Sequence, residues 1–415
     1  MSATPSTLDP HVLPEPSSPA KVSRVGYALT AVGLLLSGAA LFAEAGRFAH
    51  AYLLGFVFLW SIVLGCLFFV GLQHLTGAVW SVGVRRTAEM FASIMWLVAL
   101  LFIPVLIFTA LYEPFGLYRW VPPADGHSVI HHKQSYLNVP FFAGRAVFYF
   151  AIWIGFAVYF VRTSLRQDRA EAGPEATVAM RRRSAPFMLL FALTATFASI
   201  DWLMSLAPEW FSTVFGVYVF SGMVVTALSV ITITVLLLKR TGRYGEPSGG
   251  GSRGPGFPVR DDHLYSLGLL LFAFVCFWGY IALSQFMLIW YANMPEETIY
   301  YSKRMQDGWF YVGVLLAIVR FGIPFLALLS RSAKTDPGRL MWVSVLMIFG
   351  QVLDLYWLIM PERQGSTAMP GWADVGPLLL MAGLLAVFAA RFLGRCAVLP
   401  MGDPKFEACR RYHHL

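Results

Sequence analysis

Long apolar runs separated by polar breaks dominate the chain from about residue 26 onward. An α-helix needs about 20 apolar residues to cross the hydrocarbon core of a membrane. None of the runs shows sustained alternation of apolar and polar positions, which favours helices over a β-barrel. The pattern therefore predicts an all-α integral membrane protein with ten transmembrane helices. The predicted spans are 26–43, 51–74, 90–112, 139–161, 185–206, 211–238, 264–291, 309–330, 340–360 and 375–393.

The composition excludes a soluble enzyme. Of the 415 residues, 57% are hydrophobic and only 13% are charged, whereas soluble domains carry about 25% charged residues. The net charge of +8 would suggest nucleic acid in a soluble protein, but here it reflects cationic loops beside a membrane, and no nucleic-acid partner is expected. Four cysteines without a CxxC spacing support neither a disulfide framework nor a thiolate metal site.

The basic residues predict the orientation of the chain. The termini, the even-numbered loops and the last turn of the tenth span carry 23 Lys and Arg residues, while the opposite loops carry 6. Because basic residues collect in cytoplasmic loops, both termini are expected in the cytoplasm. Segments 113–138 and 292–308 are then the largest on the outer face. In the second of these, Asn293 as a possible helix cap and Pro295 in a first turn predict a short surface helix.

An internal repeat divides the predicted helices into two halves. Asp201 is followed by Pro at +7 and Glu at +8, and so is Asp354. The two aspartates lie four spans apart, so they share an orientation and favour two four-helix bundles, spans 2–5 and 6–9, with spans 1 and 10 as peripheral helices. The expected organisation is a disordered tail at 1–24, a first half at 25–206, a second half at 207–393 and a C-terminal tail at 394–415. The Gly-rich stretch 248–256 is interpreted as a linker.

Ionisable side chains inside the predicted spans are the candidate functional residues, because each costs at least about 2.5 kcal/mol to insert. Asp201 shares a helix face with Thr194 and Ser205, and Asp354 shares one with Gln351. One interpretation is a proton path or a quinol-facing acid. The other is a hydrogen bond between helices or an ion pair with Arg145 or Arg320, and both interpretations stay open.

The histidines argue against a redox centre in this chain. None of the nine lies in the middle of a predicted span, so a bis-histidine haem site is not expected. His74 closes the second span and, with Gln285 in the seventh, is only a weak candidate for a site. His127, His131 and His132 could contact a metal, although a solvated loop is favoured. The sequence predicts no metal site and contains no CxxCH, phosphate-loop or dinucleotide-binding motif.

Three segments resemble the NrfD-like integral-membrane subunits, and most closely the F subunits of alternative complex III, a bacterial quinol:cytochrome c oxidoreductase. They read GLQHLTGAVWSVGVRRTAEMFA (71–92), APFMLLFALTATFASIDWLMSLAPEWFSTVFGVYVFSG (185–222) and FAFVCFWGYIALSQFMLIWYANMPEETIYYSKRM (272–305). Only two candidate functional residues are assigned from this resemblance, namely Asp201 in the stretch ASIDW and Asp354 in the stretch QVLDLYW. No histidine stands beside Asp201 in any one span, so quinol oxidation by this subunit itself is not predicted.

The resemblance implies a multi-pass respiratory-chain subunit of the bacterial inner membrane that is not catalytic alone. It would support quinol oxidation and conduct protons through its intramembrane acids. It would bind no cofactor of its own, with menaquinone or another quinone as the one candidate ligand. The implied partners are a sister NrfD-like quinol-binding subunit, multihaem and monohaem cytochrome c subunits, an iron–sulfur subunit and small membrane subunits. Haem c and iron–sulfur clusters would then belong to the partners.

Two other functions compete with the respiratory one. Ten spans with repeat symmetry also suit a secondary transporter. However, Pro104 and Pro324 lack the flanking Gly-rich unwinding that is typical of transporter helices. A purely structural membrane anchor is the remaining alternative, in which the polar residues only hold the helices together.

Overall fold

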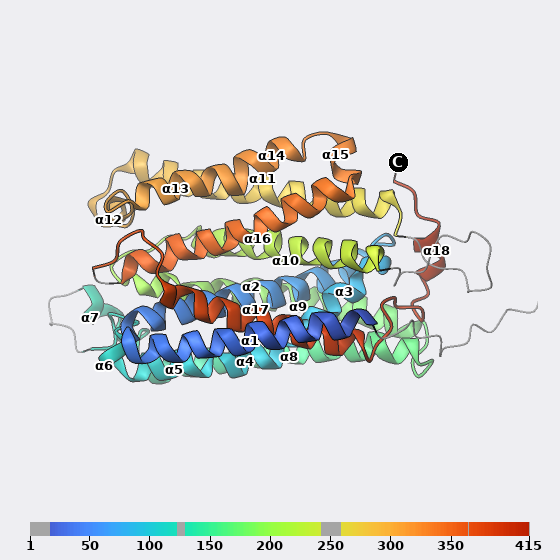
Figure 1. Cartoon of the computed structure of the whole chain (residues 1–415), viewed down its shortest axis with the longest axis horizontal. Coiled ribbons are helices and arrows are strands. Elements are labelled where there is room, and N and C mark those ends of the chain that lie inside the picture. Colours follow the sequence, from blue (N-terminus) through green and yellow to red (C-terminus); the bar gives the residue numbers. More distant parts are fainter. Residues whose placement is uncertain (1–16, 123–128, 242–258, 364, 415) are drawn as a thin grey trace, which may run out of the picture.

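The ten predicted transmembrane helices are confirmed by the fold. A computed structural model describes residues 17–122, 129–241, 259–363 and 365–414. Within these ranges ten helices are long and apolar enough to cross a membrane. They lie side by side along the long axis of the molecule, as Figure 1 shows. The chain is therefore a multi-pass membrane protein.

Among the first five spans, all but the fourth end within two residues of the predicted apolar run, whereas only the fourth begins within two residues of it. Short helices α6 (Tyr112–Phe115) and α7 (Val129–Lys133) follow the third span. The spans are α1 (Ser17–Ala43), α2 (Ala45–Thr76), the succession α3 (Val82–Ala92), α4 (Met95–Leu101) and α5 (Ile103–Ala110), α8 (Val139–Asp168), and α9 (Glu175–Trp202) with a 3-10 turn (Met204–Leu206).

The last five spans include one irregular helix. The eighth span passes through α13 (Trp309–Ala317), a π-helical turn (Ile318–Gly322) and α14 (Ile323–Ala327). The other spans are α10 (Phe215–Arg240), α11 (Asp261–Ala292), α16 (Pro337–Ile359) with a 3-10 turn (Met360–Glu362), and α17 (Trp372–Leu393). Short helices α12 (Pro295–Arg304), α15 (Arg331–Thr335) and α18 (Phe406–Arg410) complete the described chain.

Three helices begin well before the apolar run that predicted them. The third span begins at Val82 rather than at residue 90, and the fifth begins at Glu175 rather than at 185. The first begins at Ser17, so the predicted disordered tail 1–24 is wrong for its last eight residues. In each case a polar or basic helical turn extends the apolar stretch beyond the hydrocarbon, and hydropathy alone does not detect such a turn. Residues 1–16, the linker 248–256 and His127 lie outside the described residues.

Local capping signals explain several helix boundaries. The Asn138 side chain accepts a hydrogen bond from the backbone N–H of Phe141 at the start of α8, 2.9 Å away, which satisfies one of the free donors of the first turn. The short helix predicted after the seventh span is confirmed as α12, with Pro295 in its first turn. The interpretation of Asn293 needs a correction, because it ends α11 in the left-handed conformation instead of capping α12. Asparagine tolerates that conformation better than most residues.

Helices α2 and α10 form the centre of the packing. Helix α2 packs along α3, α9, α10 and α17, while α10 also packs against α11 and α16. Nearly every residue of α2 from Phe48 to His74 is buried by other helices rather than left to face lipid. Figure 1 places α7 and α12 at one end of the molecule, and α15, α18 and the start of α1 at the other.

Glycines allow α1 and α17 to approach each other closely. A Cβ atom added to Gly33 of α1 would lie against the backbone of Leu380 and 2.9 Å from the carbonyl oxygen of Gly376, both in α17. Backbone atoms cannot move aside as a flexible side chain can. Small residues at a contact between membrane helices allow this kind of close packing.

We expect Gly33→Ala to destabilise the protein, because α1 and α17 would have to separate. The cost should be about 1–3 kcal/mol, as for other overpacked contacts, and should lower the thermal unfolding midpoint in detergent. Gly38→Ala in the same helix is the matched control, since a Cβ atom there meets nothing within 4 Å. Equal midpoints for the two variants would contradict this account of the contact.

Candidate functional site

Asp201 lies in a complete hydrogen-bonded cluster near the end of α9. Its carboxylate accepts hydrogen bonds from Arg145 of α8, with Nε 2.8 Å from Oδ2 and Nη2 2.9 Å from Oδ1. The Tyr149 hydroxyl, one turn further along α8, donates to Oδ2 at 2.8 Å. The Asp201 side chain is only 1% exposed. A buried carboxylate is tolerated where a counter-charge and several donors compensate its lost hydration, and this cluster provides both.

Arg145 is held in place by aromatic rings as well as by the carboxylate. Its guanidinium carbon lies 3.9 Å from the ring centroid of Tyr136 and 4.3 Å from that of Phe141. One nitrogen also donates to the carbonyl oxygen of Tyr136, 3.0 Å away. The guanidinium is therefore fixed on three sides and presents the geometry that a bidentate pair requires.

Thr194 and Ser205, which share the face of Asp201, form local hydrogen bonds. Thr194 accepts a hydrogen bond from the Trp153 indole N–H at 2.9 Å and donates to the carbonyl oxygen of Leu190. Ser205 donates to the backbone carbonyl of Asp201, not to its carboxylate. Only Thr194 links two helices, α8 and α9, and neither hydroxyl contacts the Asp201 carboxylate.

Aromatic side chains fill the space beside the Asp201 cluster. The Trp202 ring centroid lies 4.6 Å from that of Phe102 and 5.3 Å from that of Trp60. The rings of Phe150 and Trp153 pack on other sides of the same indole. All five side chains are buried. The packed rings leave little room for water or a bound molecule between the cluster and the middle of the bundle.

Asp354 lies in a second cluster, built from three other helical segments. Arg320 Nη1 is 3.1 Å from its Oδ2, and the Tyr218 hydroxyl of α10 donates to its Oδ1. Arg320 is only 1% exposed and comes from the π-helical turn of the eighth span. Such turns occur frequently at functional sites because they redirect a single side chain.

Arg320 divides its donors among several acceptors. Nη2 donates to Gln351 Oε1 at 2.5 Å, and Nη1 also donates to the carbonyl oxygen of Gly350 at 3.1 Å. Its guanidinium carbon lies 4.8 Å from the Trp278 ring centroid. Asp354 therefore receives one nitrogen of its arginine, whereas Asp201 receives two. The second carboxylate is the less constrained of the two.

The weaker candidates lie away from both carboxylates. His74 is buried, with its ring stacked on Phe160 at an interplanar angle of 12°. Within the described chain its Nε2 atom has no hydrogen-bond partner. Gln285 is buried in α11, and among the described residues its Oε1 atom has no hydrogen-bond partner. Burial raises the pKa of the Tyr301 phenol to about 12, so that group stays neutral near physiological pH.

The histidine cluster does not form a metal site in the described part of the chain. The rings of His131 and His132 are neighbours on α7, with centroids 6.1 Å apart. Among the described residues, no three His, Cys, Asp or Glu side chains are placed to hold a metal ion together.

Sequence reasoning missed a buried ion network at the end of the molecule that carries α18. Glu89 is fully buried in α3 and lies 3.0 Å from Arg85 Nε and 3.1 Å from Arg86 Nη1. Arg85 also pairs with Asp403 of the C-terminal segment at 2.7 Å, and Arg86 pairs with Asp168 at the end of α8. The sequence does contain a motif that indicates this network, RRxxE at residues 85–89. Its spacing places both arginines beside the glutamate on one helix.

A further charged cluster ties together the ends of α12 and α16. Glu362, which follows α16, accepts hydrogen bonds from Lys303 and Arg304 of α12, each at 3.0 Å. Next to them, the rings of Trp210 and Tyr300 stack with centroids 3.9 Å apart. This cluster connects the segment that follows α9 with the C-terminal ends of α12 and α16.

Comparisons with known proteins add no identification. No protein-family model matches the chain, and no curated protein matches it significantly.

Proposed function

We propose that this chain is an integral-membrane subunit of a respiratory quinol:electron-acceptor oxidoreductase complex in the bacterial inner membrane. It has no redox centre of its own in this proposal and assembles with a quinol-binding sister subunit and with haem- and cluster-bearing subunits. The observation that carries the proposal is the pair of buried Asp–Arg–Tyr clusters, since each buried charge is costly to retain without a role. The resemblance to NrfD-like subunits supplies the class of complex.

The proposal includes two four-helix bundles, spans 2–5 and 6–9, with α1 and α17 outside them and both termini in the cytoplasm. The arginine and aspartate of each cluster support this grouping. Arg145 and Asp201 come from the fourth and fifth spans, and Arg320 and Asp354 come from the eighth and ninth. A shift of four spans therefore carries one ion pair onto the other, as a parallel repeat requires.

The Asp354 cluster is the better candidate for proton transfer. Its carboxylate and the Tyr218 hydroxyl share a hydrogen bond, which is an arrangement through which a proton can move. Arg320 can shift its donors between Gln351 and Asp354, because it already contacts both. The Asp201 carboxylate has no such alternative, since two nitrogens of one arginine hold it.

Aromatic rings cover one side of the Asp201 cluster. The rings around Trp202 fill the space next to the cluster, so this carboxylate is given no part in quinone chemistry. The proposal accordingly assigns the main quinol site to the sister subunit.

Purification in mild detergent through a C-terminal affinity tag tests the proposed complex. We expect haem c and iron–sulfur subunits to co-purify, with visible absorbance from both kinds of centre, and the tag to be accessible only from the cytoplasmic side. A colourless single chain would overturn the respiratory assignment. A tag exposed on the outer face would overturn the orientation alone.

Exchanging each aspartate for asparagine tests the two clusters in the assembled complex. Asp354→Asn should lower the protons released per quinol oxidised, because its neutral amide cannot accept a proton, while the subunits still co-purify. Asp201→Asn is expected to change the proton yield less. The measurement is proton release by the complex in sealed vesicles during quinol oxidation. An unchanged yield in both variants would contradict a proton route through these acids.

A purely structural anchor is the second candidate, and the complete pairing of Asp201 favours it. Three donors hold that carboxylate, as in an ion pair that fixes the contact between two helices. In that case Asp→Asn changes would lower the yield of assembled complex and leave the turnover of each assembled complex unchanged.

A further inference from the structure

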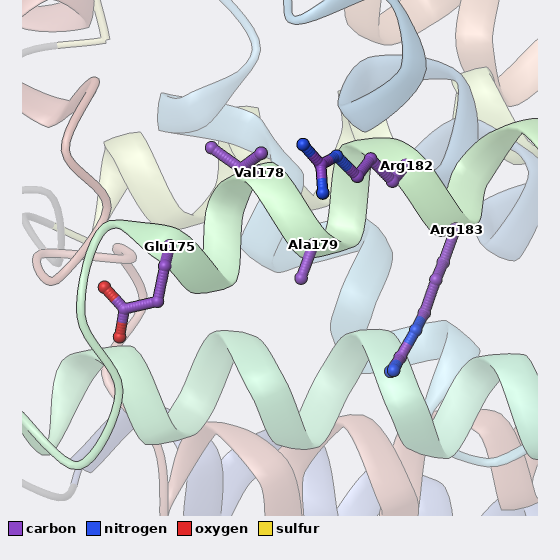
Figure 2. Close-up of a pocket in the computed structure, with 5 residues that line it drawn as sticks. All are labelled: Glu175, Val178, Ala179, Arg182 and Arg183. Carbon is purple, nitrogen blue, oxygen red and sulfur yellow. The ribbon is translucent and has the colours of Figure 1, made fainter.

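Two of three consecutive arginines of α9, Arg182 and Arg183, line a surface hollow at the end of the molecule opposite α12. The hollow has a volume of about 480 Å³ and is lined by Glu175, Val178, Ala179, Arg182 and Arg183. Figure 2 shows the Arg182 and Arg183 side chains leaving the helix in different directions, with Arg183 extending toward the neighbouring helix. There its guanidinium carbon lies 4.4 Å from the Tyr159 ring centroid of α8.

The positive charge of this rim is not neutralised by the described chain. Arg181, Arg182 and Arg183 are all exposed, and among the described residues none of the three forms an ion pair. Glu175 is the only acid that lines the hollow. Its Oε1 atom accepts a hydrogen bond from the backbone N–H of Gly173 at 3.1 Å, which directs the carboxylate toward the α8–α9 turn. The rim thus presents guanidinium donors that favour an anion.

An exposed apolar stripe begins next to the arginines and continues along α9. Leu189, Leu193 and Phe197 are 65%, 50% and 45% exposed. They follow Arg182 by 7, 11 and 15 residues, so helical periodicity places all four on one face. At about 1.5 Å per residue the stripe extends roughly 22 Å from the rim, a distance comparable to an acyl chain in one leaflet.

We propose that this face of α9 binds an anionic phospholipid. The phosphate would occupy the hollow that Arg182 and Arg183 line, and an acyl chain would follow Leu189, Leu193 and Phe197. Two features together favour a lipid over a free phosphate ion, namely unpaired guanidinium groups at the level of the headgroups and a contiguous apolar face on the same helix. Basic pockets between helices at this level of a membrane bind acidic headgroups. The site shares no residue with the two aspartate clusters.

Titration of the delipidated full chain in detergent tests this proposal. The lipids are phosphatidylglycerol and phosphatidylcholine with matched acyl chains, and the readout is the rise in the thermal unfolding midpoint with lipid concentration. We expect phosphatidylglycerol to bind more tightly than phosphatidylcholine. The double variant Arg182→Gln/Arg183→Gln should weaken phosphatidylglycerol binding about 30-fold, given the attraction expected for two basic residues near a membrane surface.

Two further variants separate a specific site from general surface charge. Arg182→Lys/Arg183→Lys keeps the charge and should keep most of the affinity, which also reports that the helix still folds. Arg410→Gln/Arg411→Gln removes the same charge from the C-terminal segment at the same end and should leave the affinity unchanged. An equal loss in this control would overturn the site. The lipid site would also be overturned if inorganic phosphate alone raised the thermal unfolding midpoint as much as phosphatidylglycerol does. That result would identify a site for an ion and not for a lipid.

Discussion

Arg320→Met is expected to lower the free energy of unfolding by about 3–5 kcal/mol, because it leaves a buried carboxylate without its counter-charge. Asp354 is 2% exposed and would retain the Tyr218 hydroxyl as its donor. Arg320 lies in the middle of its span, so no neighbouring residue at the membrane surface can replace its charge. Unfolding of the purified protein in detergent, followed by its thermal midpoint or by denaturant titration, measures the loss.

The double variant Arg320→Met/Asp354→Asn provides the decisive comparison for this ion pair. Removal of both charges leaves no isolated buried ion, so we expect the double variant to be more stable than the single one. Arg391→Met is the matched control on an exposed side chain, whose hydrogen bond to Tyr27 is also exposed, and it should cost less than about 1 kcal/mol. If the double variant were no more stable than Arg320→Met, charge pairing would not explain the loss.

The sequence predicts the helices of this protein well because hydrophobicity is the physical requirement for insertion into a membrane. A run of about 20 apolar residues is rarely stable outside a membrane-spanning helix, and all ten runs became helices. Helix ends were less predictable. Arg85, Arg86 and Glu89 were assigned to a loop and to the edge of a span, although they belong to a buried helical turn. Their burial depends on partners that are 80 to 320 residues away in the sequence, which no local pattern shows.

The pairing inside the clusters could not be derived from the sequence either. Composition and spacing marked Asp201, Asp354, Arg145 and Arg320 as unusual inside spans. Which arginine contacts which carboxylate depends on which helices are neighbours and on how each is rotated about its axis. The π-helical turn that directs Arg320 toward Asp354 has no sequence signature of its own. Tyr149 and Tyr218 were missed because tyrosine is common in membrane helices and is not costly there.

Arg85→Met is the second change with a large expected effect, because one guanidinium group stabilises two buried acids. Its Nε atom lies 3.0 Å from Glu89, and its Nη2 atom lies 2.7 Å from Asp403. The side chains of both acids are at most 1% exposed. Loss of Arg85 leaves Glu89 with Arg86 and the Ser164 hydroxyl and leaves Asp403 without an ion pair, so we expect a cost of about 3–5 kcal/mol.

The same change should also release the C-terminal segment from the helices. Asp403 is the ion-pair contact between this segment and α3, and the Gly402 N–H donates to Asp168 nearby. Trypsin should therefore cleave after Lys405 at least about tenfold faster in Arg85→Met, since each 1.4 kcal/mol increases the open population tenfold. Cleavage is followed by the loss of a C-terminal tag under native conditions.

Two further variants separate the loss of helix stability from the release of the C-terminal segment. Asp403→Asn removes only the ion pair to the segment, so it should speed cleavage while lowering the unfolding midpoint less than Arg85→Met does. Arg410→Met breaks only a pair with Glu407 on a partly exposed surface and should change neither measurement. If Arg85→Met were cleaved no faster than the unmodified protein and had the same unfolding midpoint, Asp168 and Arg86 would hold the segment without Arg85. Because the Glu89 network lies at the opposite end of the helices from Asp201 and Asp354, a loss of stability there should leave the proton yield of each assembled complex unchanged.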